Sequence, residues 1–95
     1  MRILLLKSAL LDAAWFREYY STVFPSGKTN AGKHFVDAKQ LLKLYPHIGQ
    51  TSDTADLREL QILKTPFLIV YRIRDDEIQI VRLWDQRAER PKSWV

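Results

Sequence analysis

The feature that most limits the possible folds of this chain is a pattern near its C-terminal end that predicts a β-hairpin. Residues 67–74 and 77–84 both alternate with the two-residue period of a half-buried strand, and Asp75 and Asp76 between them suit a tight turn. In the first strand one face carries Phe67, Ile69, Tyr71 and Ile73, and in the second one face carries Ile78, Ile80, Arg82 and Trp84. The pattern predicts two adjacent antiparallel strands.

Two helices are predicted in the N-terminal half. Residues 9–24 carry large apolar side chains in two adjoining rows at four-residue spacing, which predicts a helix with a wide apolar stripe. Residues 31–45 repeat apolar side chains with 4-3-4-3 spacing, which predicts a second helix with a narrower seam that Pro46 ends. The possible N-caps are Ser8 for the first helix and Thr29 or Asn30 for the second.

Two further apolar segments complete the predicted sheet. Residues 2–7 and 57–63 are the right length and composition for strands. The resulting order β-α-α-β-β-β predicts an α+β fold, with the N-terminal strand and a helical hairpin packed on a small antiparallel sheet. The first strand is expected to return beside the last one. Because 95 residues cannot support two separate cores, we expect a single domain spanning residues 1–95.

Composition excludes several classes of protein. The chain has no cysteine, so disulfides and thiolate metal sites are ruled out. Its longest early apolar run, residues 3–6, is too short for a signal peptide or a membrane span, so we expect a soluble, cytoplasmic protein. The net charge of +4 and the pI near 9.6 are compatible with an acidic partner, and equally with ordinary solubilising charge.

No cofactor or metal site is predicted. The Gly-Lys-Thr segment at 27–29 resembles part of a phosphate-binding loop, but Thr22 occupies the position of the required first glycine and a helix precedes it. The two histidines, His34 and His47, are far apart in the sequence, and the three acids at 75–77 suit a solvated turn. We therefore expect neither a nucleotide site nor a bound metal ion.

The aromatic rows of the first helix are candidates for an interface. One row contains Leu11, Trp15, Tyr19 and Val23, and the other contains Phe16, Tyr20 and Phe24. A helix in so small a domain cannot bury both rows equally. We expect Trp15 and Tyr19 in the core, which leaves Phe16 and Tyr20 for contact with a partner protein.

The C-terminal segment combines cations with aromatic surface. Arg82, Arg87, Arg90 and Lys92 are interleaved with Trp84 and Trp94. Such residues suit RNA, with guanidinium groups on phosphates and rings on bases, and they also suit an acidic peptide. Trp84 is expected to pack under the sheet, and the arginines are either functional or simply solvated.

Residues 57–60, 65–73 and 78–87 carry a resemblance to the RelE/ParE superfamily of bacterial toxins, in which they correspond to the paired strands, the final strand and its basic exit. The resemblance spans essentially the whole chain. It implies the toxin of a type II toxin–antitoxin module, a class associated with plasmid stabilisation. RelE-like members are ribosome-dependent mRNA endonucleases, whereas ParE-like members poison DNA gyrase and are not nucleases.

Departures from the RelE pattern favour the ParE branch. Leu68 stands where RelE-like toxins have an arginine, and Arg58 is the lone cation where they have paired lysines. Arg87 matches their basic residue after the last strand, but the tyrosine that should follow is missing. The resemblance therefore implies a non-enzymatic inhibitor of gyrase. Two alternatives stay open: an mRNA endonuclease with an atypical site at Arg58, Arg82, Arg87 and Arg90, or an inactivated toxin that only binds its antitoxin.

The resemblance also implies an acidic antitoxin that lies across the aromatic helix and the edge of the sheet. The expected antitoxin-binding residues are Trp15, Phe16, Tyr19, Tyr20, Arg72 and Arg74. The expected target-binding residues, toward gyrase or alternatively toward the ribosome and mRNA, are Trp84, Arg87, Arg90, Lys92 and Trp94.

Overall fold

Two helices and five strands make up the fold. The computed structural model describes residues 1–23, 28–54, 56–91 and 94, with the side chains of residues 28 and 29 excepted. The predicted loop at 24–27 and Lys92 lie outside the described residues. The elements are β1 (Arg2–Leu5), α1 (Lys7–Glu18), the π-helical turn η1 (Tyr19–Val23), α2 (Lys28–Leu44), β2 (Gln50–Thr51), β3 (Arg58–Gln61), β4 (Phe67–Arg74) and β5 (Glu77–Asp85).

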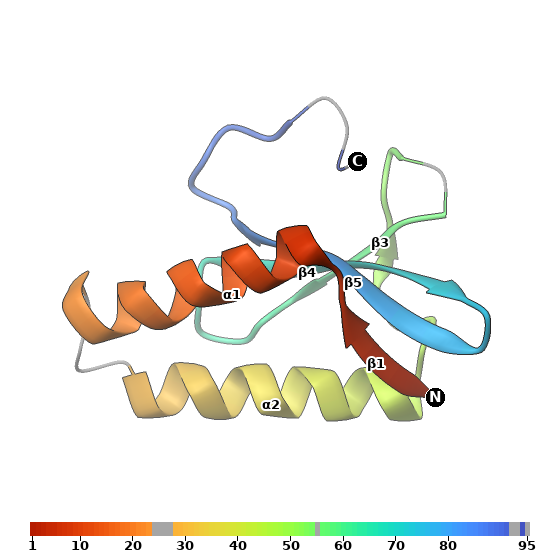
Figure 1. Cartoon of the computed structure of the whole chain (residues 1–95), viewed down its shortest axis with the longest axis horizontal. Coiled ribbons are helices and arrows are strands. Elements are labelled where there is room, and N and C mark those ends of the chain that lie inside the picture. Colours follow the sequence, from red (N-terminus) through yellow and green to blue (C-terminus); the bar gives the residue numbers. More distant parts are fainter. Residues whose placement is uncertain (24–27, 55, 92–93, 95) are drawn as a thin grey trace.

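The strands form one mixed sheet in the order β1-β5-β4-β3-β2 (Figure 1). The predicted hairpin of β4 and β5 is confirmed, as are the α+β class and the return of β1 to the side of β5. β1 runs parallel to β5, because a helical hairpin rather than a tight turn connects it to the rest of the sheet. β2 is a short addition within the segment predicted as a polar loop.

A β-bulge in β5 changes the predicted faces of the hairpin. Val70 pairs with Arg82 and Tyr71 pairs with Ile80, so Val81 has no partner in the β4–β5 pairing. One extra residue moves every later side chain to the opposite face. Ile80 therefore points to the helices whereas Trp84 lies on the other face of the sheet, and the prediction that they share a face is wrong.

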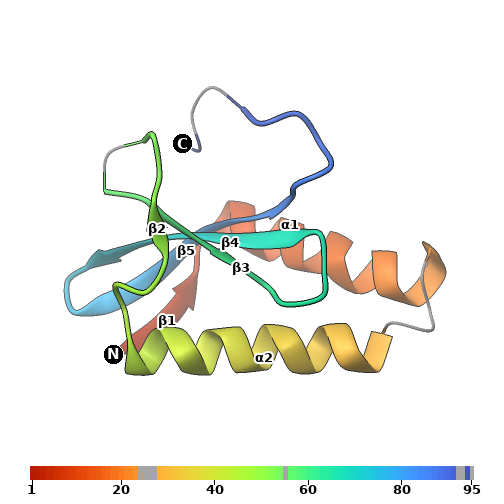
Figure 2. The same ribbon diagram turned by 180° about the vertical axis from the view of Figure 1, so that it is seen from behind.

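The core consists of two clusters, one on each face of the sheet. The larger lies between the sheet and the two helices, and the smaller lies on the opposite face, which the C-terminal segment crosses (Figures 1 and 2). The smaller cluster contains Leu57, Leu68, Val70, Val81 and Trp94, with Leu6 and Trp84 at its margin. The C-terminal segment thus covers a face of the sheet that would otherwise expose apolar side chains.

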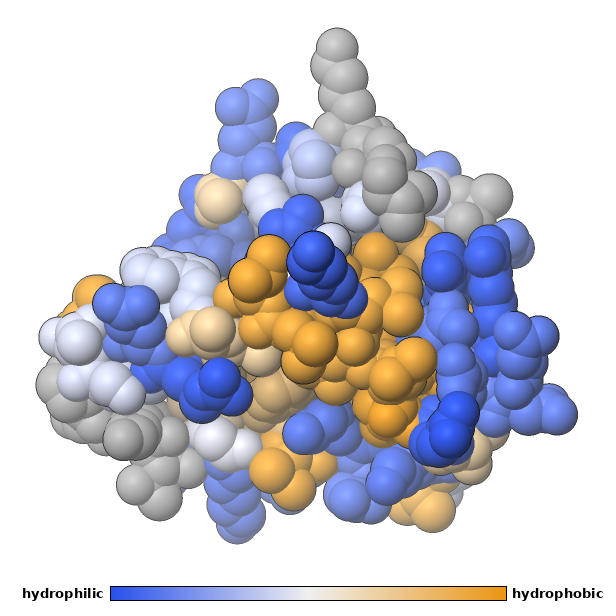
Figure 3. All heavy atoms as spheres, viewed as in Figure 1, coloured by the Kyte–Doolittle hydropathy of each residue, from blue (hydrophilic) through white to orange (hydrophobic). Residues whose placement is uncertain are grey.

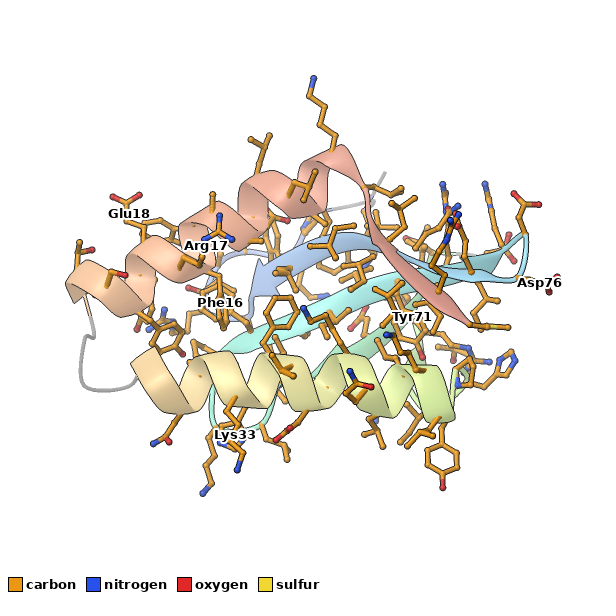
Figure 4. The ribbon with its side chains drawn as sticks, turned by 60° about the horizontal axis from the view of Figure 1, so that its bottom comes forward. Phe16, Arg17, Glu18, Lys33, Tyr71 and Asp76 are labelled. Carbon is orange, nitrogen blue, oxygen red and sulfur yellow. The ribbon has the colours of Figure 1, made fainter. Side chains whose placement is uncertain are left out.

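α1 buries a different row from the one predicted. Phe16 and Tyr20 are each only 4% exposed, whereas Trp15 is 48% exposed. Phe16 points into the space between the helices and the sheet (Figure 4), where its ring lies 4.9 Å from that of Phe67. The expectation that Phe16 and Tyr20 face a partner is therefore wrong, because α1 docks on the sheet through their row. Ser8 is not the N-cap either, since the helix begins at Lys7 with Leu6 as its cap.

α2 packs with the predicted seam. Ala31, Ala38 and Leu42 are buried, and Phe35 packs against the same core. Tyr45, the last residue of the predicted seam, follows the end of the helix and is 60% exposed. Neither helix of the described chain has the length and apolar content needed to span a bilayer.

The connection after α2 is fixed by a buried tyrosine. The Tyr71 hydroxyl accepts a hydrogen bond from the Gly49 amide at 2.9 Å and donates one to the Pro46 carbonyl at 2.7 Å. A Cβ at Gly49 would stand 2.7 Å from the Tyr71 hydroxyl oxygen and 3.0 Å from the Glu59 carbonyl oxygen. Only glycine lets this segment approach β3 and β4 so closely.

Candidate functional site

Apolar side chains form an exposed patch over β1 and the first half of α1, visible as the central orange area in Figure 3. We call Leu4, Leu10, Leu11 and Trp15 the outer α1 surface; their exposed fractions are 44%, 57%, 67% and 48%. Lys7, Arg17 and Glu18, also exposed, flank it on the same helix. A contiguous apolar area with a charged border is typical of a protein interface.

A second candidate site lies where the C-terminal segment crosses the sheet. We call Trp84, Arg90 and Trp94 the C-terminal cluster. The rings of Trp84 and Trp94 meet edge to face at 5.3 Å, and the Arg90 guanidinium lies 5.1 Å from the centre of the Trp94 ring. Trp94 is only 6% exposed. The structure thus brings together three of the five predicted target-binding residues and buries one of them, Trp94, whereas it places Arg87 beside Tyr19 at the end of α1.

Glu59 on β3 holds this segment to the sheet. One of its carboxylate oxygens accepts hydrogen bonds from Arg90 at 2.5 Å and from the Trp94 indole nitrogen at 3.3 Å. Burial alone would raise the pKa of Glu59, but the hydrogen bond and charge of Arg90 outweigh it and lower that pKa. No local pattern indicates that Glu59 meets residues more than thirty positions away.

Arg87 joins the C-terminal segment to the end of α1. Its guanidinium binds the Asp85 carboxylate at 2.7 Å and donates a hydrogen bond to the Tyr19 hydroxyl at 2.9 Å. The hydrogen bonds that Arg87 donates to Asp85 and Tyr19 raise the pKa of Arg87, and the same pairing lowers the pKa of Asp85. Tyr19, an expected antitoxin-binding residue, is half-buried and already engaged here.

Asp12 on α1 covers the exposed edge of β5 beyond the end of β1. Its carboxylate accepts two hydrogen bonds from the Arg82 guanidinium, at 2.6 and 3.1 Å, and one from the Leu83 amide at 3.0 Å. Asp12 is not a member of either apolar row of the predicted helix. Its spacing of four residues from Phe16 could have indicated a position on the buried row.

The four arginines of the alternative nuclease site do not share one pocket. Arg82 binds Asp12, Arg87 binds Asp85, and Arg90 binds Glu59. Arg58 instead donates to backbone carbonyl groups. Three of the four cations are therefore neutralised by carboxylates within the chain.

The predicted antitoxin-binding residues are also divided in space. Trp15 belongs to the outer α1 surface, while Arg72 and Arg74 lie at the hairpin end of β4. Arg72 donates a hydrogen bond to the Gln79 side chain at 2.8 Å, and Arg74 stands 4.0 Å from Asp56. Of the six residues expected to bind the antitoxin, Trp15 alone combines a large ring with an exposed position on a helix.

Replacing Glu59 with glutamine should release the C-terminal segment from the sheet. Glutamine keeps the size but loses the charge that holds Arg90, so the Trp94 indole N–H should exchange faster with solvent in E59Q.

In the unchanged chain the same loss should occur on acidification. Because folding lowers the pKa of Glu59, its carboxylate stabilises the fold fully at any pH above the pKa that this group has in the unfolded chain. This stabilisation is lost as the pH falls through the lower pKa of Glu59 in the folded chain. Indole hydrogen exchange measured by NMR would show both effects.

The matched control for this experiment is Glu89→Gln, because Glu89 is an exposed glutamate of the same segment. It should leave the exchange of the Trp94 indole unchanged. Equal exchange rates in E59Q and the unchanged chain would contradict the role given to Glu59.

Comparison with known proteins places the chain in a family. The family model described as "ParE toxin of type II toxin-antitoxin system, parDE" matches residues 3–90. A solved structure described as "Chromosomal ParDE TA system from P. aeruginosa" shares the fold, with a TM-score of 0.70 and 24% identity over 87% of this chain and 92% of that chain. No curated protein matches the chain. Because the family match covers nearly all of the sequence, the chain belongs to the ParE toxin family of type II toxin–antitoxin systems.

Proposed function

We propose that this chain is a cytoplasmic toxin that inhibits DNA gyrase and is neutralised by an acidic antitoxin encoded beside it. Membership of the ParE toxin family carries the proposal. The pairing of Arg82, Arg87 and Arg90 with carboxylates supports inhibition by binding rather than by RNA cleavage, since a nuclease needs free cations and a proton-transferring group around one phosphate.

The outer α1 surface is the proposed contact for the antitoxin. An amphipathic helix could cover Leu11 and Trp15, which lie one helical turn apart, while its acidic side chains face Lys7 and Arg17. A partner that is disordered when free would gain most of its binding energy from such apolar contacts.

Leu11→Glu should weaken binding of the antitoxin by at least about tenfold, because it places a carboxylate in the middle of an apolar contact. Leu11 is 67% exposed, so the substitution should leave the fold intact. Binding would be measured by calorimetry with the antitoxin encoded by the neighbouring gene. Leu63→Glu is the matched control, since Leu63 is 66% exposed but follows β3 and lines a pocket with residues of α2 rather than of α1. Unchanged affinity in L11E would place the antitoxin elsewhere.

Induced expression with and without the neighbouring gene tests the function itself. The proposal expects growth arrest from the chain alone, relief on co-expression, and loss of supercoiling when purified chain is added to gyrase. Cleavage of mRNA on programmed ribosomes, abolished by Arg87→Ala, would replace gyrase inhibition with the nuclease alternative. Absence of growth arrest together with tight antitoxin binding would instead indicate an inactivated toxin.

A further inference from the structure

A polar cavity of about 600 Å³ opens between the β2–β3 connection and the hairpin end of β4, apart from the outer α1 surface and the C-terminal cluster. Its wall includes His47, Arg58 and Arg74, which are nitrogen-bearing side chains, together with the apolar Leu57 and Ile73 and one acid, Asp56. Hydroxyl side chains from the β2–β3 connection complete it. The volume lies in the range of ordinary ligand sites.

The two arginines of this cavity differ from most other arginines of the fold. Arg2, Arg82, Arg87 and Arg90 each bind a carboxylate oxygen within 2.8 Å. Arg58 binds only backbone carbonyls among the described residues, and Arg74 reaches its nearest carboxylate only at 4.0 Å. The cavity therefore carries two guanidinium groups without a close carboxylate partner among the described residues.

Arg58 is held in place without being neutralised. One nitrogen of its guanidinium donates to the carbonyls of His47 at 3.1 Å and Gly49 at 2.9 Å. The segment that carries those carbonyls is itself fixed by Tyr71, which lies near the C-terminal end of α2 (Figure 4). A guanidinium has five N–H donors, so the carbonyl contacts leave donors for a ligand. Such a group is preorganised for an anion.

Arg74 supplies a second, more exposed cation. Its ion pair with Asp56 is long, and the two side chains are 51% and 77% exposed. An exposed pair at this distance contributes little and yields readily to a better-placed anion. Asp56 would then lose a weak partner, whereas the arriving anion would gain two guanidinium groups.

We propose that this cavity binds a carboxylate presented by a peptide, with an apolar side chain next to it lying against Leu57 and Ile73. Arginine forks match a carboxylate through paired hydrogen bonds. A nucleic acid suits the cavity less well, because Asp56 lines it and Asp75 and Asp76 occupy the adjoining hairpin turn (Figure 4). Those acids would repel the successive phosphates of a polyanion, but a single carboxylate needs only the two arginines.

The test is titration of the ¹⁵N-labelled whole chain with acetyl-aspartyl-leucinamide, followed by NMR. We expect saturable shifts of the backbone amides of His47, Arg58 and Arg74. In Arg74→Gln the affinity should fall about tenfold, the usual loss for one charge-assisted hydrogen bond. Arg17→Gln, which removes an exposed arginine on α1, should leave the affinity unchanged.

Further probes distinguish a carboxylate site from a phosphate site and from a purely apolar one. Acetyl-asparaginyl-leucinamide has the same shape without the charge and should bind at least several-fold more weakly. Equal binding of the two peptides, or equal affinity of R74Q and the unchanged chain, would overturn the proposal. Tighter binding of inorganic phosphate or of a short single-stranded DNA at the same amides would also overturn it, in favour of a phosphate site. None of these results depends on whether gyrase is the target.

Discussion

Phe16→Ala should lower the free energy of unfolding by about 3–5 kcal/mol, the usual cost of removing a fully buried phenylalanine. The Phe16 ring is 4% exposed, and it lies 4.9 Å from the ring of Phe67 and 5.4 Å from that of Phe35. It therefore joins α1 to both the sheet and α2. A domain of this size has a total stability of only about 5–15 kcal/mol. Urea unfolding followed by circular dichroism would measure the loss.

The neighbouring Trp15→Ala is the matched control for this prediction. Trp15 is 48% exposed and makes an edge contact of 6.1 Å with Tyr19, so its removal should cost no more than about 1 kcal/mol. The order of the two losses decides which row of α1 is in the core. A larger loss in Trp15→Ala than in Phe16→Ala would contradict the docking of α1 through the Phe16 row.

The sequence was sufficient to predict both helices and four of the five described strands, because each of these depends on local periodicity, whereas the two-residue strand β2 was missed. The hairpin turn at Asp75 and Asp76, the stop at Pro46 and the return of β1 to β5 were all predicted and confirmed. Local periodicity could not decide which of the two rows of α1 is buried. Both rows contain aromatic residues at the same spacing, so the choice depends on how the helix docks against the sheet.

The C-terminal cluster shows the same division. Its membership was largely predictable, since both tryptophans and the arginine occur within one short segment. The state of its charge was not, because Glu59, which binds Arg90, comes from a strand far away in the sequence. An arginine that looks available in the sequence is neutralised once the fold supplies a carboxylate. Conversely, the sequence does not indicate that Arg58 binds backbone carbonyl groups and that Arg74 has only a distant carboxylate partner.

Gly49→Ala should lower the free energy of unfolding by about 2–6 kcal/mol, the sum of two costs. The added methyl group would overlap the Tyr71 ring and hydroxyl, at 2.8 and 2.7 Å, and also the Glu59 carbonyl at 3.0 Å. Tyr71 is fully buried, so its ring cannot move aside into solvent. Overpacking of this kind costs about 1–3 kcal/mol. Displacing the hydroxyl from Gly49 and Pro46 adds about 1–3 kcal/mol for buried groups left unpaired.

A double-mutant cycle with Tyr71→Phe separates the two costs. Phenylalanine removes the hydroxyl, so Tyr71→Phe alone should lose about 1–3 kcal/mol through the unpaired Gly49 amide and Pro46 carbonyl. In the double variant the hydrogen bonds of the Tyr71 hydroxyl are already absent, so Gly49→Ala cannot remove them a second time. The overlap between the hydroxyl and the new methyl group is absent as well. The combined loss should therefore be smaller than the sum of the single losses. Strict additivity would mean that Gly49 is needed for a reason other than its contact with Tyr71.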